Sequence, residues 1–531
     1  MKQLNRKIEI FDSTLRDGAQ SEGINFSIQD KLNIVKTLDA FGVSYIEAGN
    51  PGSNPKDLEF FSKVNELKIN STLVAFGSTR RKNIKAEEDN NIKSLLEANT
   101  SAVAIFGKSW ILHVKEIINT TPEENLNMIN DTVSYLNNQG KKVIYDAEHF
   151  FDGYKSDPDY ALKTLKAAYS GGAQTLVLCD TNGGSFPYEI YEITQKVIQE
   201  FPDATIGIHC HNDSAFAEAN TIMAIKAGAG HIQGTFIGYG ERCGNTNLAA
   251  VIPSLQLKMN CQCVPDLTPL TDTAKKIAEI SNVTLMQFMP YVGSSAFTHK
   301  AGMHADGVLK VSNSFEHINP ESVGNERKFV LSEIAGRNAL INKIKNYFPD
   351  LTKDSPKVTD ILNQIKAMEK DGYQFESAEA TFLLIVYKTL GLYVPQFELV
   401  SYKTTTEAPS EKLLSATAVV KIKVLDKYEL TCAQGDGPVN ALDLALRKAL
   451  EVFYPNLAKM SLIDYKVRVL DSKEATAAKV RVLISSTDGS DVWSTVGVST
   501  DLIEASFKAL VDSIEYKLMS DKKIIRNNNK K

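Results

Sequence analysis

Short apolar runs alternate with longer stretches of helical spacing through the first half of the chain. Between the runs, apolar residues recur as in a helix, for example at Ile28, Leu32 and Leu38. Eight strand–helix units in about 250 residues predict a TIM barrel, an α/β fold, over residues 1–265. A doubly wound sheet is the alternative, but no G-x-G-x-x-G follows the first run. The eight runs are residues 7–11, 43–48, 72–76, 102–106, 142–145, 175–179, 205–209 and 231–236.

The second half of the chain has two further patterns. Helical spacing continues through polar loops, which predicts helical connecting subdomains over residues 266–400. From residue 410 to 520, alternating runs enclose two helical stretches, which predicts a small α+β domain. The polar stretch 402–411 is the predicted linker, and residues 521–531 are a predicted polar tail.

Composition excludes several classes of protein. The 531 residues are 43% hydrophobic and 23% charged, with a net charge of −5, so no nucleic-acid-binding footprint is expected. The sequence contains no run of about 18 apolar residues, so no membrane-spanning helix is predicted. The polar N-terminus does not resemble a secretory signal, and six sparse cysteines indicate reduced thiols. We therefore expect a cytoplasmic protein that binds neither nucleic acid nor membrane.

Polar side chains gather where the predicted strands end. The carboxyl ends of the strands in a TIM barrel meet at one rim, so groups far apart in sequence converge there. The two imidazoles of His209 and His211, at positions i and i+2 of a strand, face the same side. A single histidine at a strand end is often structural, but a pair on this rim favours a metal site. The rim groups include Asp12, Arg16, Asp17, Glu47, Asp146, Glu148, Thr181, His209, His211 and Asn245.

A mixed nitrogen and oxygen site suits a divalent ion, and Zn²⁺, Mn²⁺ and Mg²⁺ all remain open. Asp17 and Asn245 are the best-placed oxygen ligands. Arg16 would then face the substrate as a fixed cation. Asp12 would hold Arg16 or orient a ligand.

Three motifs carry a family resemblance: "DSTLRDGAQ" at 12–20, "HCHND" at 209–213 and "GYGERCGNTN" at 238–247. They resemble the 2-isopropylmalate, homocitrate and citramalate synthases, metal-dependent barrels that condense acetyl-CoA with a 2-oxo acid. The resemblance runs from about residue 8 to 518 and includes "SSAFTHKAGMHADGVLK" and "GDGPVNALDLALRKAL". Within the family, "YDAEHFFDGYK" and "STDGSDVWSTVGVS" are most similar to the citramalate branch.

The resemblance implies a role for each matching residue. The family's metal ligands fall on Asp17, His209, His211 and Asn245, its substrate-clamping arginine on Arg16, its rim glutamate on Glu148, its carboxylate-binding threonine on Thr181 and its proton-handling histidine on His304. One position departs from the family, because Phe315 stands where a tyrosine is frequent. Asp146, two residues before Glu148, would narrow the pocket for the oxo acid.

The implied reaction joins acetyl-CoA to pyruvate and gives citramalate. A larger oxo acid, as in 2-isopropylmalate or homocitrate synthases, is the nearest alternative. An acyl-CoA lyase would use a reactive cysteine, and Cys243 lies in a suitable loop, but Glu241 and Arg242 replace the expected glycines. A non-catalytic amino-acid sensor is the third alternative, against which the complete rim argues.

The last domain adds no histidine, since all eight lie before residue 320, so assembly or control is its expected role. Gly437 and Pro438 open a helix whose N–H groups could hold a carboxylate. Ser494 and Thr495 offer hydroxyls on a second strand-rich stretch. The resemblance implies feedback by a branched-chain amino acid, here isoleucine, and a homodimer.

Overall fold

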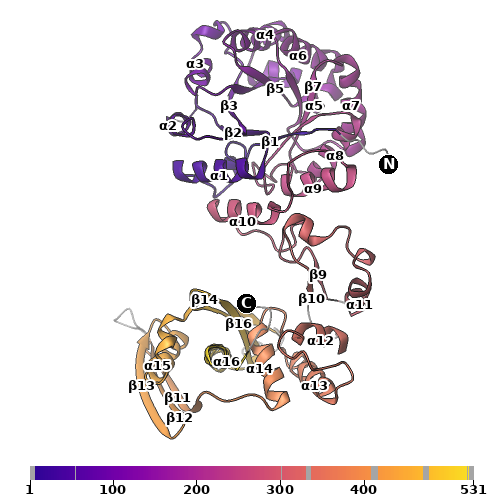
Figure 1. Cartoon of the computed structure of the whole chain (residues 1–531). Coiled ribbons are helices and arrows are strands. Elements are labelled where there is room, and N and C mark those ends of the chain that lie inside the picture. Colours follow the sequence, from indigo (N-terminus) through magenta and orange to yellow (C-terminus); the bar gives the residue numbers. More distant parts are fainter. Residues whose placement is uncertain are drawn as a thin grey trace. The chain divides into compact units, whose positions relative to one another are not determined.

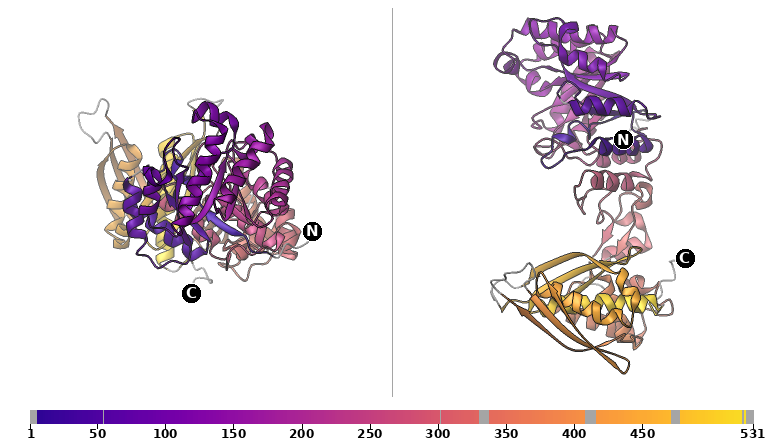
Figure 2. Two further views of the ribbon diagram at one scale, coloured as in Figure 1. Left: turned by 90° about the horizontal axis from the view of Figure 1, so that it is seen from above. Right: turned by 90° about the vertical axis from the view of Figure 1, so that its left-hand side faces the viewer.

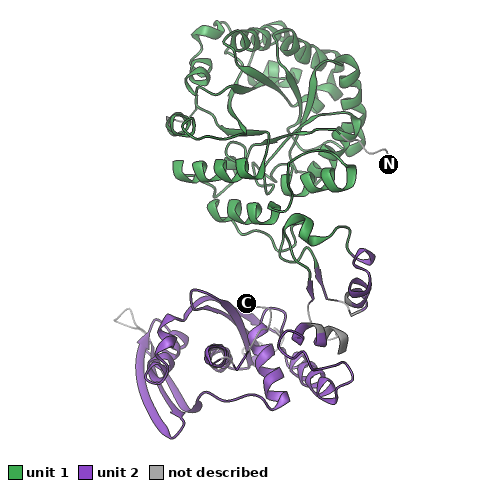
Figure 3. Cartoon of the chain, viewed as in Figure 1, with its two compact units in different colours: residues 1–297, 316–327 green, residues 298–315, 328–531 purple. Residues whose placement is uncertain are grey.

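The computed structural model describes residues 6–53, 55–300, 302–329, 337–407, 416–470, 477–522 and 524–525. The chain divides into two compact units (Figure 3). The first comprises residues 1–297 and 316–327, and the second comprises residues 298–315 and 328–531.

The first unit contains a closed barrel of eight parallel strands, in the order β1 to β8 (Figure 1). The last strand pairs with the first, with Ile10 opposite Ile232. The predicted TIM barrel is therefore confirmed, and each predicted strand overlaps an observed one. The strands are β1 Glu9–Asp12, β2 Tyr45–Gly49, β3 Thr72–Ser78, β4 Ala102–Lys108, β5 Lys142–Glu148, β6 Thr175–Asp180, β7 Thr205–Cys210 and β8 His231–Gly234.

Helices surround the barrel, and local sequence explains where several begin. Ser27 forms a capping box with Asp30 at the start of α1. Prolines occupy the first turn of α4, α6 and α7, where no backbone N–H is required. The helices are α1 Ile28–Phe41, α2 Pro55–Val64, α3 Asn90–Glu97, α4 Pro122–Asn138, α5 Phe150–Ser156, α6 Pro158–Ser170, α7 Pro187–Glu200, α8 Ala217–Ala227, α9 Leu248–Met259 and α10 Leu270–Ile280.

Apolar side chains fill both faces of the barrel strands. One large cluster lies between strands and helices and includes Ile46, Val103 and Leu176. A smaller cluster with Phe11 and Val177 fills the barrel interior. Both faces of the strands are thus buried, as parallel sheets require, and polar groups are left for the strand ends.

The second unit begins with short elements and continues into two antiparallel sheets (Figure 2). Helix α15 packs on the sheet β11-β12-β13, and α16 packs on β14-β15-β16. The elements are β9 Thr298–His299, α11 Gly302–Lys310, β10 Lys328–Phe329, α12 Arg337–Ile344, α13 Pro356–Lys370, α14 Glu379–Leu390, β11 Glu398–Thr406, β12 Ala416–Val424, β13 Lys427–Gly435, α15 Pro438–Glu451, β14 Ser461–Val469, β15 Val480–Thr487, β16 Val492–Ser499 and α16 Leu502–Asp521.

The linker predicted over residues 402–411 is wrong in its first part. Residues 402–406 belong to β11, which pairs with β12 along its length. Lys403, Thr405 and Thr406 of this edge strand are exposed and polar, so this part of the strand resembles a loop in sequence. Residues 408–411 lie outside the described residues.

The helix α14 packs against one of the two sheets. Its Phe382 belongs to the same apolar cluster as Val496 of β16.

Two further observations concern cysteines and membranes. All six cysteines are described, and none forms a disulfide. Among the described residues, no helix combines the length and apolar character needed to cross a bilayer.

Candidate active site

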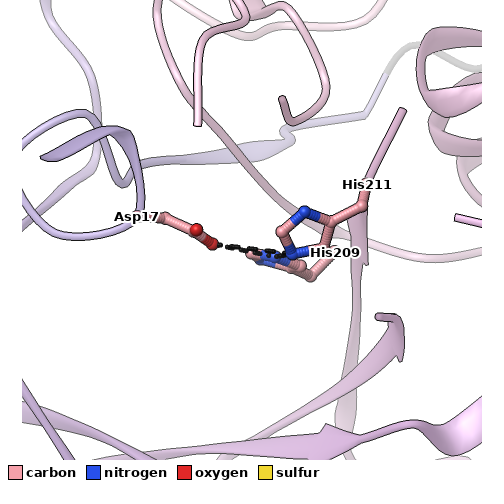
Figure 4. Close-up of side chains that lie close together, drawn as sticks. All are labelled: Asp17, His209 and His211. Carbon is pink, nitrogen blue, oxygen red and sulfur yellow. Dashed lines mark hydrogen bonds and ion pairs between the residues drawn. The ribbon is translucent and has the colours of Figure 1, made fainter. Parts of the chain in front are cut away.

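Asp17, His209 and His211 meet at the carboxyl end of the barrel (Figure 4). The Nε2 atoms of the two histidines are 3.4 Å apart. Asp17 Oδ2 lies 3.2 Å from His209 Nε2 and 3.9 Å from His211 Nε2. One potential ligand atom from each residue lies within 4.8 Å of the other two, and all three residues are buried. This spacing allows the three atoms to share one divalent ion.

Asn245 completes the group of four predicted ligands. Its Nδ2 is 3.0 Å from Asp17 Oδ2 and 3.3 Å from His209 Nε2, and the backbone at Asn245 forms a bridge with His211. Exchanging the amide oxygen and nitrogen would turn the oxygen toward the imidazoles. Asp17 Oδ1, His211 Nδ1 and Asn245 Oδ1 are buried and have no hydrogen-bond partner among the residues that the structure describes. The two imidazoles, together with the unpaired oxygens of Asp17 and Asn245, form a set of nitrogen and oxygen ligands that fits a divalent cation.

The electrostatics of the group favour a negative Asp17 beside imidazole. Burial opposes its ionisation, but the Arg16 guanidinium and the neighbouring His209 hold the pKa of the Asp17 carboxyl well below its usual range. Burial and the neighbouring His209 lower the pKa of His211 to about 4, so its imidazole is neutral near pH 7. A neutral imidazole is the form that binds a metal.

Arg16 is fixed by carboxylates on two sides and by an aromatic ring. Its Nε donates to Glu47 Oε2 at 2.7 Å, and its Nη1 lies 3.2 Å from Asp17 Oδ2. The guanidinium carbon lies 3.9 Å from the centre of the Phe76 ring. Asp12, expected to hold Arg16 or to orient a ligand, accepts a 2.9 Å hydrogen bond from the Thr14 N–H. Glu47, rather than Asp12, therefore holds Arg16 together with Asp17.

Asp146 and Thr181 also lie at the strand ends. Asp146 is buried, and burial raises the pKa of its carboxyl to about 7. The Thr181 hydroxyl accepts a 2.8 Å hydrogen bond from the backbone N–H of His149, whose φ is 56°. That hydroxyl therefore retains a proton to donate. Glu148 forms an ion pair with Lys108 on the neighbouring strand.

The other predicted site residues belong to the second unit. His304 is exposed on α11, and its ring stacks on Phe315 with centroids 4.3 Å apart. Gly437 is the N-cap of α15, and Pro438 occupies its first turn.

The two predicted hydroxyls of β16 are already engaged. The Thr495 hydroxyl is buried and donates to the Ala509 carbonyl at 2.7 Å. The Ser494 hydroxyl lies 2.8 Å from that of Ser485. Any role in effector binding stays a prediction.

Sequence reasoning left Glu47 without a role and did not single out Gln233. Both are fully buried beside the predicted ligands. A strand-end glutamate on β2 was visible in the pattern. By contrast, Gln233 lies one residue before the end of β8 in an apolar context, and nothing in its own sequence signals a polar contact.

Three family models match consecutive parts of the chain. An HMGL-like model matches residues 7–283, a homocitrate synthase post-HMGL domain-like model 291–372, and a LeuA allosteric (dimerisation) domain model 376–518. The (R)-citramalate synthase of Aquifex aeolicus is 52% identical over 97% of this chain and 98% of its own. The (R)-citramalate synthase of Geobacter sulfurreducens is 45% identical over 97% and 98%. This chain belongs to the (R)-citramalate synthase family.

The chain is also similar to more distant proteins. The 2-isopropylmalate synthase of Pyrococcus furiosus is 30% identical over 96% of this chain and 99% of its own. Among solved structures, the HMG-CoA lyase of Bacillus subtilis covers 53% of this chain and 95% of its own with a TM-score of 0.46 and 21% identity, too distant a likeness to bear on the reaction.

Proposed function

We propose that this chain catalyses the condensation of acetyl-CoA with pyruvate, which gives (R)-citramalate and CoA. The observation that carries this proposal is the 44–52% identity to five (R)-citramalate synthases over 96–98% of the chain. The clustered donors of the barrel supply groups suited to that chemistry.

Asp17, His209, His211 and Asn245 are the residues we propose to hold a divalent cation. Such an ion, when bound, would polarise the oxo group of pyruvate. The four side chains come from three separate strand ends, and their donor atoms already face one another. The identity of the ion stays open among Zn²⁺, Mn²⁺ and Mg²⁺.

Arg16 and Thr181 are proposed to bind the substrate. The guanidinium of Arg16 cannot turn freely, because Glu47, Asp17 and the Phe76 ring restrain it. It would stabilise the negative charge that develops on the oxo oxygen when the new carbon–carbon bond forms. The hydroxyl proton of Thr181 would bind the carboxylate of pyruvate.

Proton transfer is assigned to His304 and Glu148. A base must remove a proton from the methyl group of acetyl-CoA, and an imidazole works near pH 7. Glu148 would orient that imidazole or activate the water that hydrolyses the thioester. The family resemblance supports both assignments, and Asp146 is proposed to limit the size of the oxo acid.

The direct test measures free thiol released from acetyl-CoA with a panel of 2-oxo acids. We expect pyruvate to give the highest kcat/KM. If 2-oxoisovalerate or 2-oxoglutarate exceeds pyruvate by tenfold, a difference of about 1.4 kcal/mol in transition-state stabilisation, then the proposed substrate is wrong. A lyase or a sensor would release no thiol from this mixture.

The metal assignment has its own test. We expect His209→Ala to lose stoichiometric metal, because it removes one of two imidazoles at the centre of the group. Elemental analysis of the purified proteins measures this content. His317→Ala, a histidine change elsewhere in the first unit, is the control and should keep its metal. Full metal content in His209→Ala would place the site elsewhere.

Isoleucine feedback and a homodimer complete the proposal. The match of residues 376–518 to the LeuA allosteric (dimerisation) domain supports both. A dose–response curve on the full chain with isoleucine, leucine and valine tests the effector. Allosteric coupling of about 1–3 kcal/mol corresponds to a change of about 5- to 150-fold. A chain that responds to none of the three amino acids would leave this domain as a dimerisation module.

A further inference from the structure

Gln233 connects a predicted metal ligand to a buried carboxylate. This glutamine is fully buried near the end of β8, directly opposite His209 of β7 in the sheet register. Its Oε1 lies 2.9 Å from His209 Nδ1, and its Nε2 donates to Asp146 Oδ1 at 2.9 Å. The three side chains form a continuous chain of hydrogen bonds from β5 through β8 to β7.

The direction of this chain decides which nitrogen of His209 carries the proton. The NH₂ group of Gln233 donates to Asp146 Oδ1, which accepts this hydrogen bond whether or not the carboxyl is ionised. The amide oxygen of Gln233 is then turned toward His209, where it can only accept a hydrogen bond. The proton of the neutral imidazole must therefore lie on Nδ1, and the lone pair on Nε2 faces Asp17 and His211.

We propose that Gln233 is a positioning residue that fixes the orientation and tautomer of His209 for metal binding, with Asp146 as its anchor. This inference rests on the proposed metal site. Gln233 itself contributes no ligand, since both ends of its amide are occupied by His209 and Asp146. Asp146 thereby gains a role besides limiting the size of the oxo acid.

A positioning role for Gln233 and simple packing have different consequences. A side chain that only fills space could be replaced by methionine, which has a similar length and shape. Methionine offers neither the acceptor for His209 nor the donor for Asp146. Loss of a partner that orients a ligating histidine costs about 10- to 100-fold in metal affinity.

The experiment measures Mn²⁺ binding to metal-free full-length protein by the paramagnetic resonance signal of free Mn²⁺. We expect Gln233→Met to weaken binding by about 10- to 100-fold. The double variant Gln233→Glu, Asp146→Asn reverses the donor and acceptor at the anchor but keeps the acceptor for His209. It should recover most of the affinity that Gln233→Met loses.

Two controls make the outcome decisive. Gln256→Met removes a glutamine whose amide oxygen accepts from backbone N–H groups of Cys263 and Val264, and it should bind Mn²⁺ like the wild type. Equal affinity in Gln233→Met and the wild type would overturn the positioning role, as would failure of the double variant to exceed Gln233→Met. Equal binding by His209→Ala and the wild type would instead overturn the metal site itself, and this inference with it.

Discussion

Arg16 illustrates how single residues of the site are held from several directions. Its guanidinium reaches Glu47 and Asp17 at once, and its central carbon lies 3.9 Å from the centre of the Phe76 ring. Lysine has a single ammonium group and no plane to stack on a ring. The arginine is therefore restrained before any substrate arrives, so little reorganisation is needed during the reaction.

We expect Arg16→Lys to lower kcat by about 10²- to 10³-fold in the thiol-release assay, because the positive charge is no longer held in one place. Arg447→Lys is the matched control. Like Arg16, Arg447 bonds a carboxylate, that of Asp443; it also donates to the Met460 carbonyl, and it belongs to the second unit. A kcat for Arg16→Lys within twofold of the control would show that Arg16 has no part in the chemical step.

Glu515 of α16 gives the second unit a dependence on pH. Its carboxylate accepts from the backbone N–H of Gln396 at 3.1 Å, yet burial outweighs this bond and raises the pKa to about 7. The ordinary value is 4.5, so between about pH 4.5 and 7 the folded state binds a proton that the unfolded state has released. This group therefore stabilises the fold at the acidic end of that window, and its contribution is lost as the pH rises through 7.

The consequence can be measured through tryptophan fluorescence. In a Trp110→Phe background, Trp493 alone reports on the second unit. Between pH 5 and 7.5, the free energy of unfolding should fall more steeply in this background than when Glu515→Gln is added. Glu398→Gln, a change at an exposed position, should leave the slope unaltered. Equal slopes with Glu515 and with glutamine would contradict the raised pKa.

At the scale of elements, α5 depends on a close approach to the end of β4. A Cβ added to Gly153 would lie 2.2 Å from the Ser109 carbonyl oxygen, which is backbone and cannot turn away. We expect Gly153→Ala to destabilise the barrel by about 1–3 kcal/mol. Urea unfolding followed by Trp110 fluorescence, in a Trp493→Phe background, measures the change.

Gly184→Ala is the matched control for this prediction, because a Cβ added there meets nothing within 4 Å. Its free energy of unfolding should stay close to that of the background. A loss of stability in Gly184→Ala equal to that in Gly153→Ala would mean that backbone flexibility, rather than contact with Ser109, is responsible.

The elements of the barrel could be predicted from the sequence because their strands are apolar on both faces and are separated by helical spacing. The edge strand β11 could not be predicted over its full length, because most of its exposed residues are polar and resemble those of a loop. In the site, the pair His209 and His211 followed from the period of a strand. The partner of Arg16 could not be predicted in this way, because the pairing of β1 with β2 is what brings Glu47 next to Arg16.

At the scale of the whole molecule, the proposed metal site spans the joint where the barrel closes. Asp17 follows β1 and Asn245 follows β8, and these two strands pair with each other. An ion bound to both residues would stabilise only the closed barrel. By mass action, free Mn²⁺ at 100 times its dissociation constant should add about 2.7 kcal/mol to the free energy of unfolding.

Thermal unfolding followed by Trp110 fluorescence in the Trp493→Phe background checks this expectation, with and without Mn²⁺. The apparent Tm should rise with the ion in the His317→Ala protein and stay constant in His209→Ala. An equal rise in both variants would show that Mn²⁺ stabilises the chain through some other site.

The distance along the chain between Asp17 and Asn245 also has a consequence for biosynthesis. The two residues are separated by 228 positions. A ribosome that adds about 5–20 residues per second needs roughly 10–45 seconds to reach the second after the first. Throughout that interval the nascent chain has a carboxylate without its amide partner. The chain would therefore bind the ion we propose only as a complete barrel. The choice among the metal ions available in the cell would be made after translation has passed β8.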